Sequence, residues 1–190
     1  MADRGVCRGK VLVLGHSFVR RLQTFLGNDQ IQLYGHRVTF CGIGGATVGT
    51  LRAKLSRMNV TDFCIVYVEI GTNDLCISSG ETVAADISSL IAYLRTHGIT
   101  QVILGEILSR SKQWVRGPSL EEFAMQVRQV NTTMMAWTCQ RRNVSFWKHR
   151  RLHSPGLLHR DGVHLNRRGM HLYWRSVRGA LVKHLRHACC

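Results

Sequence analysis

Residues 63–70 form the segment that most limits how this chain can fold. Their sequence, Phe-Cys-Ile-Val-Tyr-Val-Glu-Ile, is apolar at nearly every position and lacks the alternation of a strand with one face in water. A strand of this kind has both faces covered, as at the centre of a parallel sheet between helices. It ends at Gly71-Thr-Asn-Asp74, so polar residues follow the carboxyl end of a central strand.

Strand and helix patterns alternate along the rest of the chain. Further strands are expected at about residues 10–14, 32–40, 101–104 and 143–147, and helices at about 18–26, 51–55, 82–97, 119–140 and 166–187. Ser119 and Glu122 have the spacing of a capping box at the start of one of these helices. The alternation predicts a three-layer α/β/α sandwich with a five-stranded parallel sheet. For a chain of 190 residues we expect a single domain, with its core at about residues 10–187.

Reactive residue types follow several of the predicted strands. Ser17 comes directly after the first strand, a glycine-rich loop at residues 42–49 follows the second, and Asn73 follows the third. Asp161 and His164 lie in the long loop after the last strand. Ligand sites in open α/β sheets lie at the carboxyl ends of the strands. These residues are therefore expected to meet in one cleft.

The residue types match the requirements of acyl transfer. A serine hydroxyl becomes a good nucleophile when a histidine removes its proton and a carboxylate orients that histidine, as His164 and Asp161 could do for Ser17. The oxyanion that forms needs preorganised donors, which the N–H of Ser17, an N–H of the glycine loop and the amide of Asn73 could supply. Taken singly, Ser17 and Asn73 could each be helix caps, and the glycines could be turn residues.

Four blocks of sequence resemble those of the SGNH, or GDSL-like, hydrolase family in order and spacing. They are Gly15-His-Ser17, the loop at 42–49, Gly71-Thr-Asn-Asp74 and Asp161-Gly-Val-His164. The resemblance implies a flavodoxin-like fold, hydrolysis of carboxylic esters or thioesters, and no metal or organic cofactor. It also implies roles for individual residues: Ser17 as nucleophile, Gly45 and Asn73 with Ser17 in the oxyanion hole, Asp161 as orienting carboxylate and His164 as base.

The first block departs from the family pattern. The family usually has Asp between the glycine and the serine, where this chain has His16, and this change bears on how the turn is held. With a histidine at this place, residues 15–22 also bear a looser similarity to domains found beside the coding segments of animal retrotransposons. The similarity fits a basic hydrolase without a secretion signal.

The charge balance supports a second hypothesis. Lys and Arg outnumber Asp and Glu by 26 to 11, so the protein attracts anions such as nucleic acid, anionic lipid or an acidic substrate. The alternative to an esterase is thus a catalytically idle SGNH-like module that binds nucleic acid or another polyanion. The basic residues concentrate late in the chain, at Lys148, Arg150, Arg151, Arg160, Arg167 and Arg168.

Few features indicate a location or a metal. The first ten residues are charged rather than apolar, and no apolar run reaches 18 residues, so we expect no transmembrane segment. Seven scattered cysteines suit a reducing compartment, so we expect a cytoplasmic protein. Cys189 and Cys190 are read as exposed thiols rather than as a lipid anchor. Histidines such as His149 and His153 do not have the spacing of a zinc site, and none is expected. The oligomeric state stays open.

Overall fold

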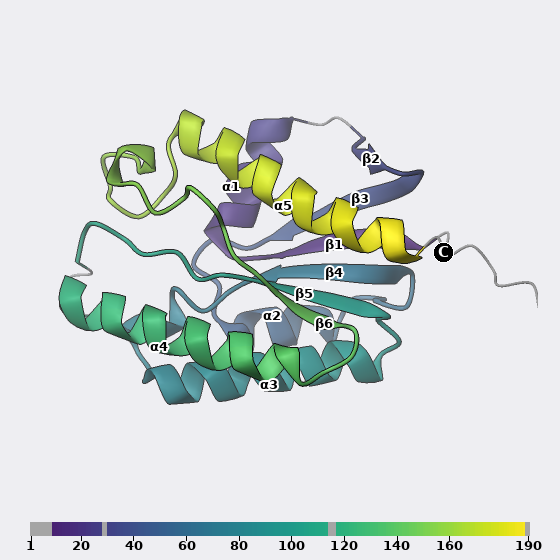
Figure 1. The fold of residues 1–190 in the computed structure, drawn as a ribbon, viewed down its shortest axis with the longest axis horizontal. Helices are drawn as coiled ribbons and strands as arrows, with labels where there is room; N and C mark the ends of the chain where they lie inside the picture. Colours follow the sequence, from purple (N-terminus) through teal and green to yellow (C-terminus); the bar gives the residue numbers. More distant parts are fainter. Residues whose placement is uncertain (1–8, 28–29, 114–116, 189–190) are drawn as a thin grey trace, which may run out of the picture.

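A six-stranded sheet forms the centre of the protein (Figure 1). The structure is a computed structural model that describes residues 9–27, 30–113 and 117–188. The strands lie in the order β2-β3-β1-β4-β5-β6, and every neighbouring pair is parallel except β2 with β3. Their bounds are β1 (Lys10–Gly15), β2 (Gln32–Leu33), β3 (His36–Gly42), β4 (Phe63–Glu69), β5 (Gln101–Gly105) and β6 (Val144–Trp147).

The predicted number of five strands is wrong by one. The segment expected to be a single strand at about 32–40 is a hairpin, in which Gln32 pairs with Arg37 and Leu33 with His36. Tyr34 and Gly35 form its turn with φ values of 50° and 78°. Two consecutive residues with positive φ are typical of a tight hairpin turn, which a pattern of apolar positions does not reveal.

Five α-helices cover the two faces of the sheet, which confirms the predicted three-layer architecture (Figure 1). Helices α1 (Ser17–Leu26) and α5 (Arg167–Ala188) lie on one face, and α2 (Val48–Leu55), α3 (Gly80–Thr96) and α4 (Leu120–Cys139) lie on the other. Two short 3₁₀ turns, at Asp74–Cys76 and Pro155–Leu157, stand in the loops.

The alternation of side chains along β1 and β4 divides the core in two. Val11 and Val13 pack with α1 and α5, whereas Leu12 and Leu14 pack with the three helices on the opposite face. All four are fully buried because the central strands have no face in water. The same alternation directs the side chain of Glu69, at the end of β4, toward α5, where Tyr173 contacts it.

Side-chain caps set the starts of several helices. Ser17 does not cap α1, as one interpretation of the sequence had it. His16 is the cap instead, and its Nδ1 accepts a hydrogen bond of 3.3 Å from the N–H of Phe18. At α4 the predicted capping box of Ser119 and Glu122 is present. The hydroxyl of Ser17 is consequently free of a capping role and available to the cleft.

Candidate active site

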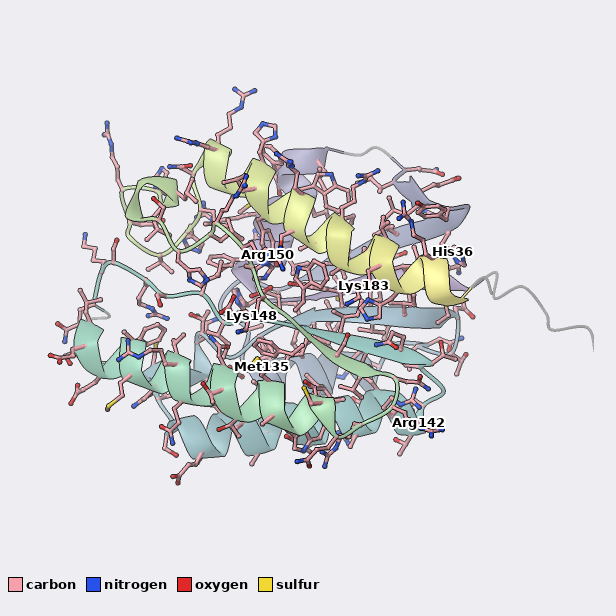
Figure 2. All side chains as sticks on the ribbon, in the orientation of Figure 1. His36, Met135, Arg142, Lys148, Arg150 and Lys183 are labelled. Carbon is pink, nitrogen blue, oxygen red and sulfur yellow. The ribbon has the colours of Figure 1, made fainter. Side chains whose placement is uncertain are left out.

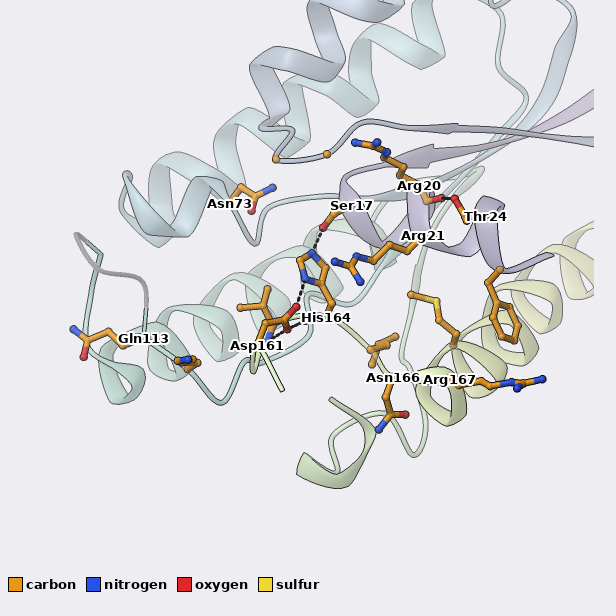
Figure 3. Close-up of a pocket in the computed structure, with 17 residues that line it drawn as sticks. Ser17, Arg20, Arg21, Thr24, Asn73, Gln113, Asp161, His164, Asn166 and Arg167 are labelled. Carbon is orange, nitrogen blue, oxygen red and sulfur yellow. Dashed lines mark hydrogen bonds and ion pairs between the residues drawn. The ribbon is translucent and has the colours of Figure 1, made fainter. Parts of the chain in front are cut away.

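A pocket of about 1170 Å³ lies at the carboxyl ends of β1, β3 and β4 (Figure 3). All five residues that the sequence analysis proposed for the site line this pocket, although they come from four separate parts of the chain: Ser17, Gly45, Asn73, Asp161 and His164. Ser17 begins α1, whereas Asp161 and His164 belong to the loop before α5. The pattern of strand ends thus predicted residues that the sheet brings together.

Ser17, His164 and Asp161 form a chain of hydrogen bonds (Figure 3). The distance from Ser17 Oγ to His164 Nε2 is 3.1 Å, and that from His164 Nδ1 to Asp161 Oδ2 is 2.8 Å. Since an ionised carboxylate can only accept, Nδ1 carries the proton that His164 donates to Asp161. Nε2 is then left with a lone pair for the hydroxyl proton of Ser17, which is the arrangement a general base requires.

The turn between Asp161 and His164 keeps the carboxylate ionised. Asp161 Oδ1 accepts hydrogen bonds from the backbone N–H groups of Val163, at 2.9 Å, and His164, at 2.8 Å. Partial burial raises the pKa of Asp161, but these two bonds and the contact with the His164 ring outweigh it, so the pKa lies well below its usual value. The carboxylate therefore stays negative across the physiological pH range.

Ser17, Gly45 and Asn73, which all line the pocket, each carry a hydrogen-bond donor. Within the described chain, neither the N–H of Ser17 nor that of Gly45 has an acceptor. Gly45 has φ of +70°, in a region that is unfavourable for residues with a side chain. The glycine loop adopts this backbone conformation where it lines the pocket. Asn73 Nδ2 donates to the carbonyl of Ala46 at 2.8 Å, which fixes the amide and leaves its second proton for a ligand.

Asp74 holds the glycine loop against the following strand end. Its Oδ1 accepts a 2.9 Å hydrogen bond from the N–H of Val48, the first residue of α2. Burial raises the pKa of Asp74 despite this bond. The neighbouring residues Asn73 and Asp74 therefore both bind the loop that carries Gly45, and so set its position relative to Ser17.

His16 replaces the carboxylate that the family pattern has before the serine. Its side chain is 2% exposed, and burial lowers its pKa to about 4. A neutral imidazole keeps an unprotonated Nδ1, which is the atom that accepts from Phe18. The residue therefore performs the capping of α1 without adding a charge beside His164.

A buried polar network under the pocket was not predicted. Glu69 Oε2 accepts hydrogen bonds from the hydroxyls of Tyr67, at 2.7 Å, and Tyr173, at 3.2 Å, and lies 3.0 Å from His149 Nε2. Burial raises the pKa of Glu69, yet the attraction and hydrogen bond of His149 outweigh it and hold the pKa below its usual value. The signal in the sequence was one glutamate in an otherwise apolar strand, but two of its three partners, His149 and Tyr173, lie 80 and 104 positions away.

Four cationic side chains line the same pocket: Arg20, Arg21, Lys112 and Arg167. Arg20 and Arg21 stand three and four residues after Ser17, a spacing that places residues on one face of a helix, so this signal was readable in the sequence. Arg167 belongs to the basic concentration noted late in the chain and follows His164 by three residues, whereas Lys112 had no comparable signal. Among the described residues none of the four has a carboxylate partner, and Asp161, the one carboxylate of the lining, is bound to His164.

A comparison with known protein families shows which family the chain belongs to. Residues 9–172 match the GDSL-like lipase/acylhydrolase family. The chain belongs to this family. The match confirms the resemblance seen in the sequence and places the chain among the hydrolases. Comparison with curated protein sequences gives no match.

Three solved structures of similar fold are described as an acylhydrolase, a lipase and a carbohydrate esterase. A provisionally assigned acylhydrolase from Bacteroides fragilis has 19% identity and a TM-score of 0.77, over 93% of this chain and 88% of its own. A GDSL-like lipase from Bacteroides thetaiotaomicron has 17% identity and a TM-score of 0.73, over 96% and 92%. A carbohydrate esterase from Talaromyces cellulolyticus has 19% identity and a TM-score of 0.68, over 94% and 99%. At these identities the likeness concerns the fold.

Two further properties concern the part of the chain that the structure describes. No helix there is both long and apolar enough to cross a membrane. No three metal-ligating side chains gather there either, and His149 is engaged with Glu69. Cys189 and Cys190, the residues considered for lipidation, lie outside the described ranges.

Proposed function

We propose that this GDSL-like hydrolase cleaves carboxylic esters or thioesters through an acyl-enzyme on Ser17. The observation that carries the proposal is the hydrogen-bonded chain from Ser17 Oγ through the His164 ring to Asp161, at 3.1 and 2.8 Å, open to a pocket. The names of the structural relatives, an acylhydrolase, a lipase and a carbohydrate esterase, support the reaction class only.

In the first half of the reaction, Ser17 Oγ attacks the carbonyl carbon while its proton passes to His164 Nε2. The carbonyl π electrons move to oxygen, and the N–H groups of Ser17 and Gly45 with the amide of Asn73 stabilise the oxyanion. When the carbonyl re-forms, the bond to the alkoxide or thiolate breaks, and the leaving group takes the proton from Nε2. The acyl group is then an ester of Ser17.

The second half repeats these steps with water. His164 removes a proton from the water, which attacks the acyl carbon, and a second oxyanion forms in the same place. Its collapse breaks the bond to Ser17 Oγ, which takes back the proton from Nε2, and the carboxylic acid leaves. Asp161 stays ionised throughout and stabilises the imidazolium that exists between the proton transfers.

A fluorophosphonate probe tests the assignment of Ser17 directly. We expect the wild-type protein to be labelled and Ser17→Ala to lose labelling and the hydrolysis of aryl acetates without a change in circular dichroism. Ser154→Ala, which removes an exposed hydroxyl in the loop before the 3₁₀ turn at Pro155–Leu157, is the matched control and should behave as wild type. Labelling that persists in Ser17→Ala would show that another residue is the nucleophile. Absence of labelling in the wild type would favour the idle binding module instead.

The cations of the pocket indicate which esters it favours. The one carboxylate that lines the pocket, Asp161, is bound to His164, whereas four cations line the pocket with Ser17 and His164: Arg20, Arg21, Lys112 and Arg167. An anionic group on the acyl or alcohol part would therefore be attracted, by an amount that solvent exposure keeps near 0.5 to 1 kcal/mol for each cation. We propose that the substrate is an ester bearing a carboxylate or phosphate.

A charge comparison tests this preference. We expect kcat/KM for a succinate half-ester of an aryl alcohol to exceed that of the matching neutral butyrate ester. In Arg21→Gln the ratio of the two values should fall about two- to fivefold while activity on the neutral ester stays. A ratio that does not respond to Arg21→Gln or Arg167→Gln would contradict the preference and leave the hydrolase assignment intact.

A further inference from the structure

A second hollow, of about 680 Å³, lies over β6 between α4 and α5. It has no lining residue in common with the pocket around Ser17. Five of its lining residues are cationic, from the loop after β6 and from α5: Lys148, Arg150, Arg151, Arg175 and Lys183. We call this hollow the β6 groove. In Figure 2, Lys148, Arg150 and Lys183 lie between the two helices, across from Met135 of α4.

Few acidic residues lie near these cations along the chain. Residues 141–190 contain 12 Lys and Arg but one acidic residue, Asp161, which is bound to His164. Among the described residues, no carboxylate forms an ion pair with any of the five cations of the β6 groove. Crowded like charges repel one another, so the β6 groove is suited to a ligand that carries several negative charges.

The backbone that presents these cations is firmly anchored. His149 is fully buried between the exposed Lys148 and Arg150, and its two ring nitrogens contact Glu69 Oε2 at 3.0 Å and Ser176 Oγ at 2.9 Å. Its N–H also donates to Glu106 Oε2 at 2.8 Å, and the same carboxylate oxygen lies 3.4 Å from His153 Nε2. Because the side chain between them points into the core, Lys148 and Arg150 project outward from a fixed position. Such preorganisation lowers the entropic cost of binding.

The next residue adopts a strained conformation. Arg151 has φ of +69°, in the left-handed region that costs a residue with a side chain on the order of 1 kcal/mol. A glycine at this position would avoid the strain, but the residue is an arginine. Its side chain is the third cation of this loop that lines the β6 groove. Strain retained at a surface position is a pointer to a functional site.

Aromatic rings form part of the same surface. Phe146 and Trp147, both half-buried, line the β6 groove beside the cations. The indole of Trp147 is fixed by a 3.0 Å hydrogen bond from Nε1 to Ser176 Oγ. Cations that contact phosphates, together with rings on which bases stack, are the combination found where proteins bind single strands of nucleic acid.

We propose that the β6 groove binds single-stranded nucleic acid, with backbone phosphates on its five cations and bases against Phe146 and Trp147. Bases of a duplex are already stacked on one another, so they cannot reach rings inside a hollow. Anionic lipid headgroups could also contact these cations, but a lipid surface fits less well because the β6 groove lacks large exposed apolar side chains that would insert among the acyl chains. The large exposed apolar residues of the described chain lie elsewhere: Tyr34, Ile77, Leu120 and Met125.

Fluorescence anisotropy with a fluorescein-labelled dT12 strand tests the proposal in the full-length protein. The logarithm of the affinity should fall with the logarithm of salt concentration with a slope of about −2 to −3.5, as expected for three to five phosphate contacts on a single strand. A labelled 12-base-pair duplex and phosphatidylserine vesicles should bind more weakly. Tighter binding of the duplex or the vesicles than of dT12 would overturn the proposal.

The matched variants remove two positive charges in different places. The double variant Lys148→Gln, Arg150→Gln should bind dT12 about 25-fold more weakly at 0.1 M salt and reduce the slope by about 1.4. Lys54→Gln, Arg57→Gln removes the same net charge near the end of α2, a helix that α3 separates from α4, and should stay within about threefold of wild type. Equal losses in the two variants would mean that only net charge matters, and would refute the site.

The proposal is independent of catalysis. Ser17→Ala should bind dT12 as the wild type does, whether or not the hydrolase assignment is correct. The groove variant should in turn keep its activity on neutral aryl acetates, since the β6 groove has no residue in the pocket around Ser17. Loss of dT12 binding in Ser17→Ala would contradict the assignment of the strand to the β6 groove.

Discussion

The substitution Asp161→Asn separates the two tasks of the Asp161 side chain. Oδ1 accepts the N–H groups of Val163 and His164 and so holds the turn, whereas Oδ2 orients the His164 ring. An asparagine can retain the first task, because its amide oxygen also accepts two hydrogen bonds. It cannot orient His164 as Oδ2 does, because the atom in that place is now an amide nitrogen, which donates. This nitrogen can bond to His164 Nδ1 only if Nδ1 has lost its proton.

The expected result follows from this tautomer change. With the proton moved to Nε2, His164 presents a donor instead of a lone pair to Ser17, and kcat should fall about 10⁴-fold, which corresponds to about 5.4 kcal/mol. The melting temperature should change little. Asp161→Ala is the comparison, because it also removes both turn hydrogen bonds, worth about 2 kcal/mol together, and should lower Tm by about 4–8 °C in a chain of this size.

Aryl acetate hydrolysis and calorimetric melting measure the two effects. If Asp161→Asn retains more than about a tenth of the wild-type kcat, orientation of His164 by the carboxylate is not needed, and the proposed mechanism is wrong. If instead Asp161→Asn melts as early as Asp161→Ala, the amide oxygen does not replace Oδ1, and the division of tasks between the two oxygens is wrong.

Two further substitutions probe the parts around the nucleophile. In Gly45→Ala the added Cβ meets no atom within 4 Å, so its effect comes from φ of +70°. An alanine disfavours this conformation by about 1–2 kcal/mol, so the backbone should relax and tilt the N–H of residue 45. We expect kcat to fall about 10- to 100-fold with KM little changed. An unchanged kcat would exclude this N–H from the oxyanion hole. The pKa of His16 is about 4 in the folded protein and 6.5 in the unfolded chain, so the unfolded state binds the proton first as pH falls. The free energy of unfolding therefore decreases between pH 6.5 and pH 4, by up to about 1.4 kcal/mol per pH unit. His16→Asn, which keeps a cap acceptor but does not titrate, should lose less stability over this range in urea denaturation, and parallel profiles would contradict the buried neutral histidine.

Local sequence patterns predicted the parts of the site that depend on one strand and the loop after it. An apolar run followed by Gly15-His-Ser17, and another followed by Asn73, identify strand ends, because burial on both faces requires continuous apolar residues. Hairpin geometry escaped this reasoning. The turn at Tyr34 and Gly35 depends on backbone conformation rather than on hydrophobic period, so the sixth strand was missed.

The tertiary structure decided which distant side chains meet. Ser17 and His164 are 147 residues apart, and they come within hydrogen-bond distance because the order of the strands brings the loop before α5 over the end of β1. Glu69 and His149 pair in the core, and the basic residues after β6 face one groove, for the same reason. Amino-acid order along a segment governs its burial and periodicity, whereas contacts between segments depend on sheet order and helix packing. Only the folded chain determines those.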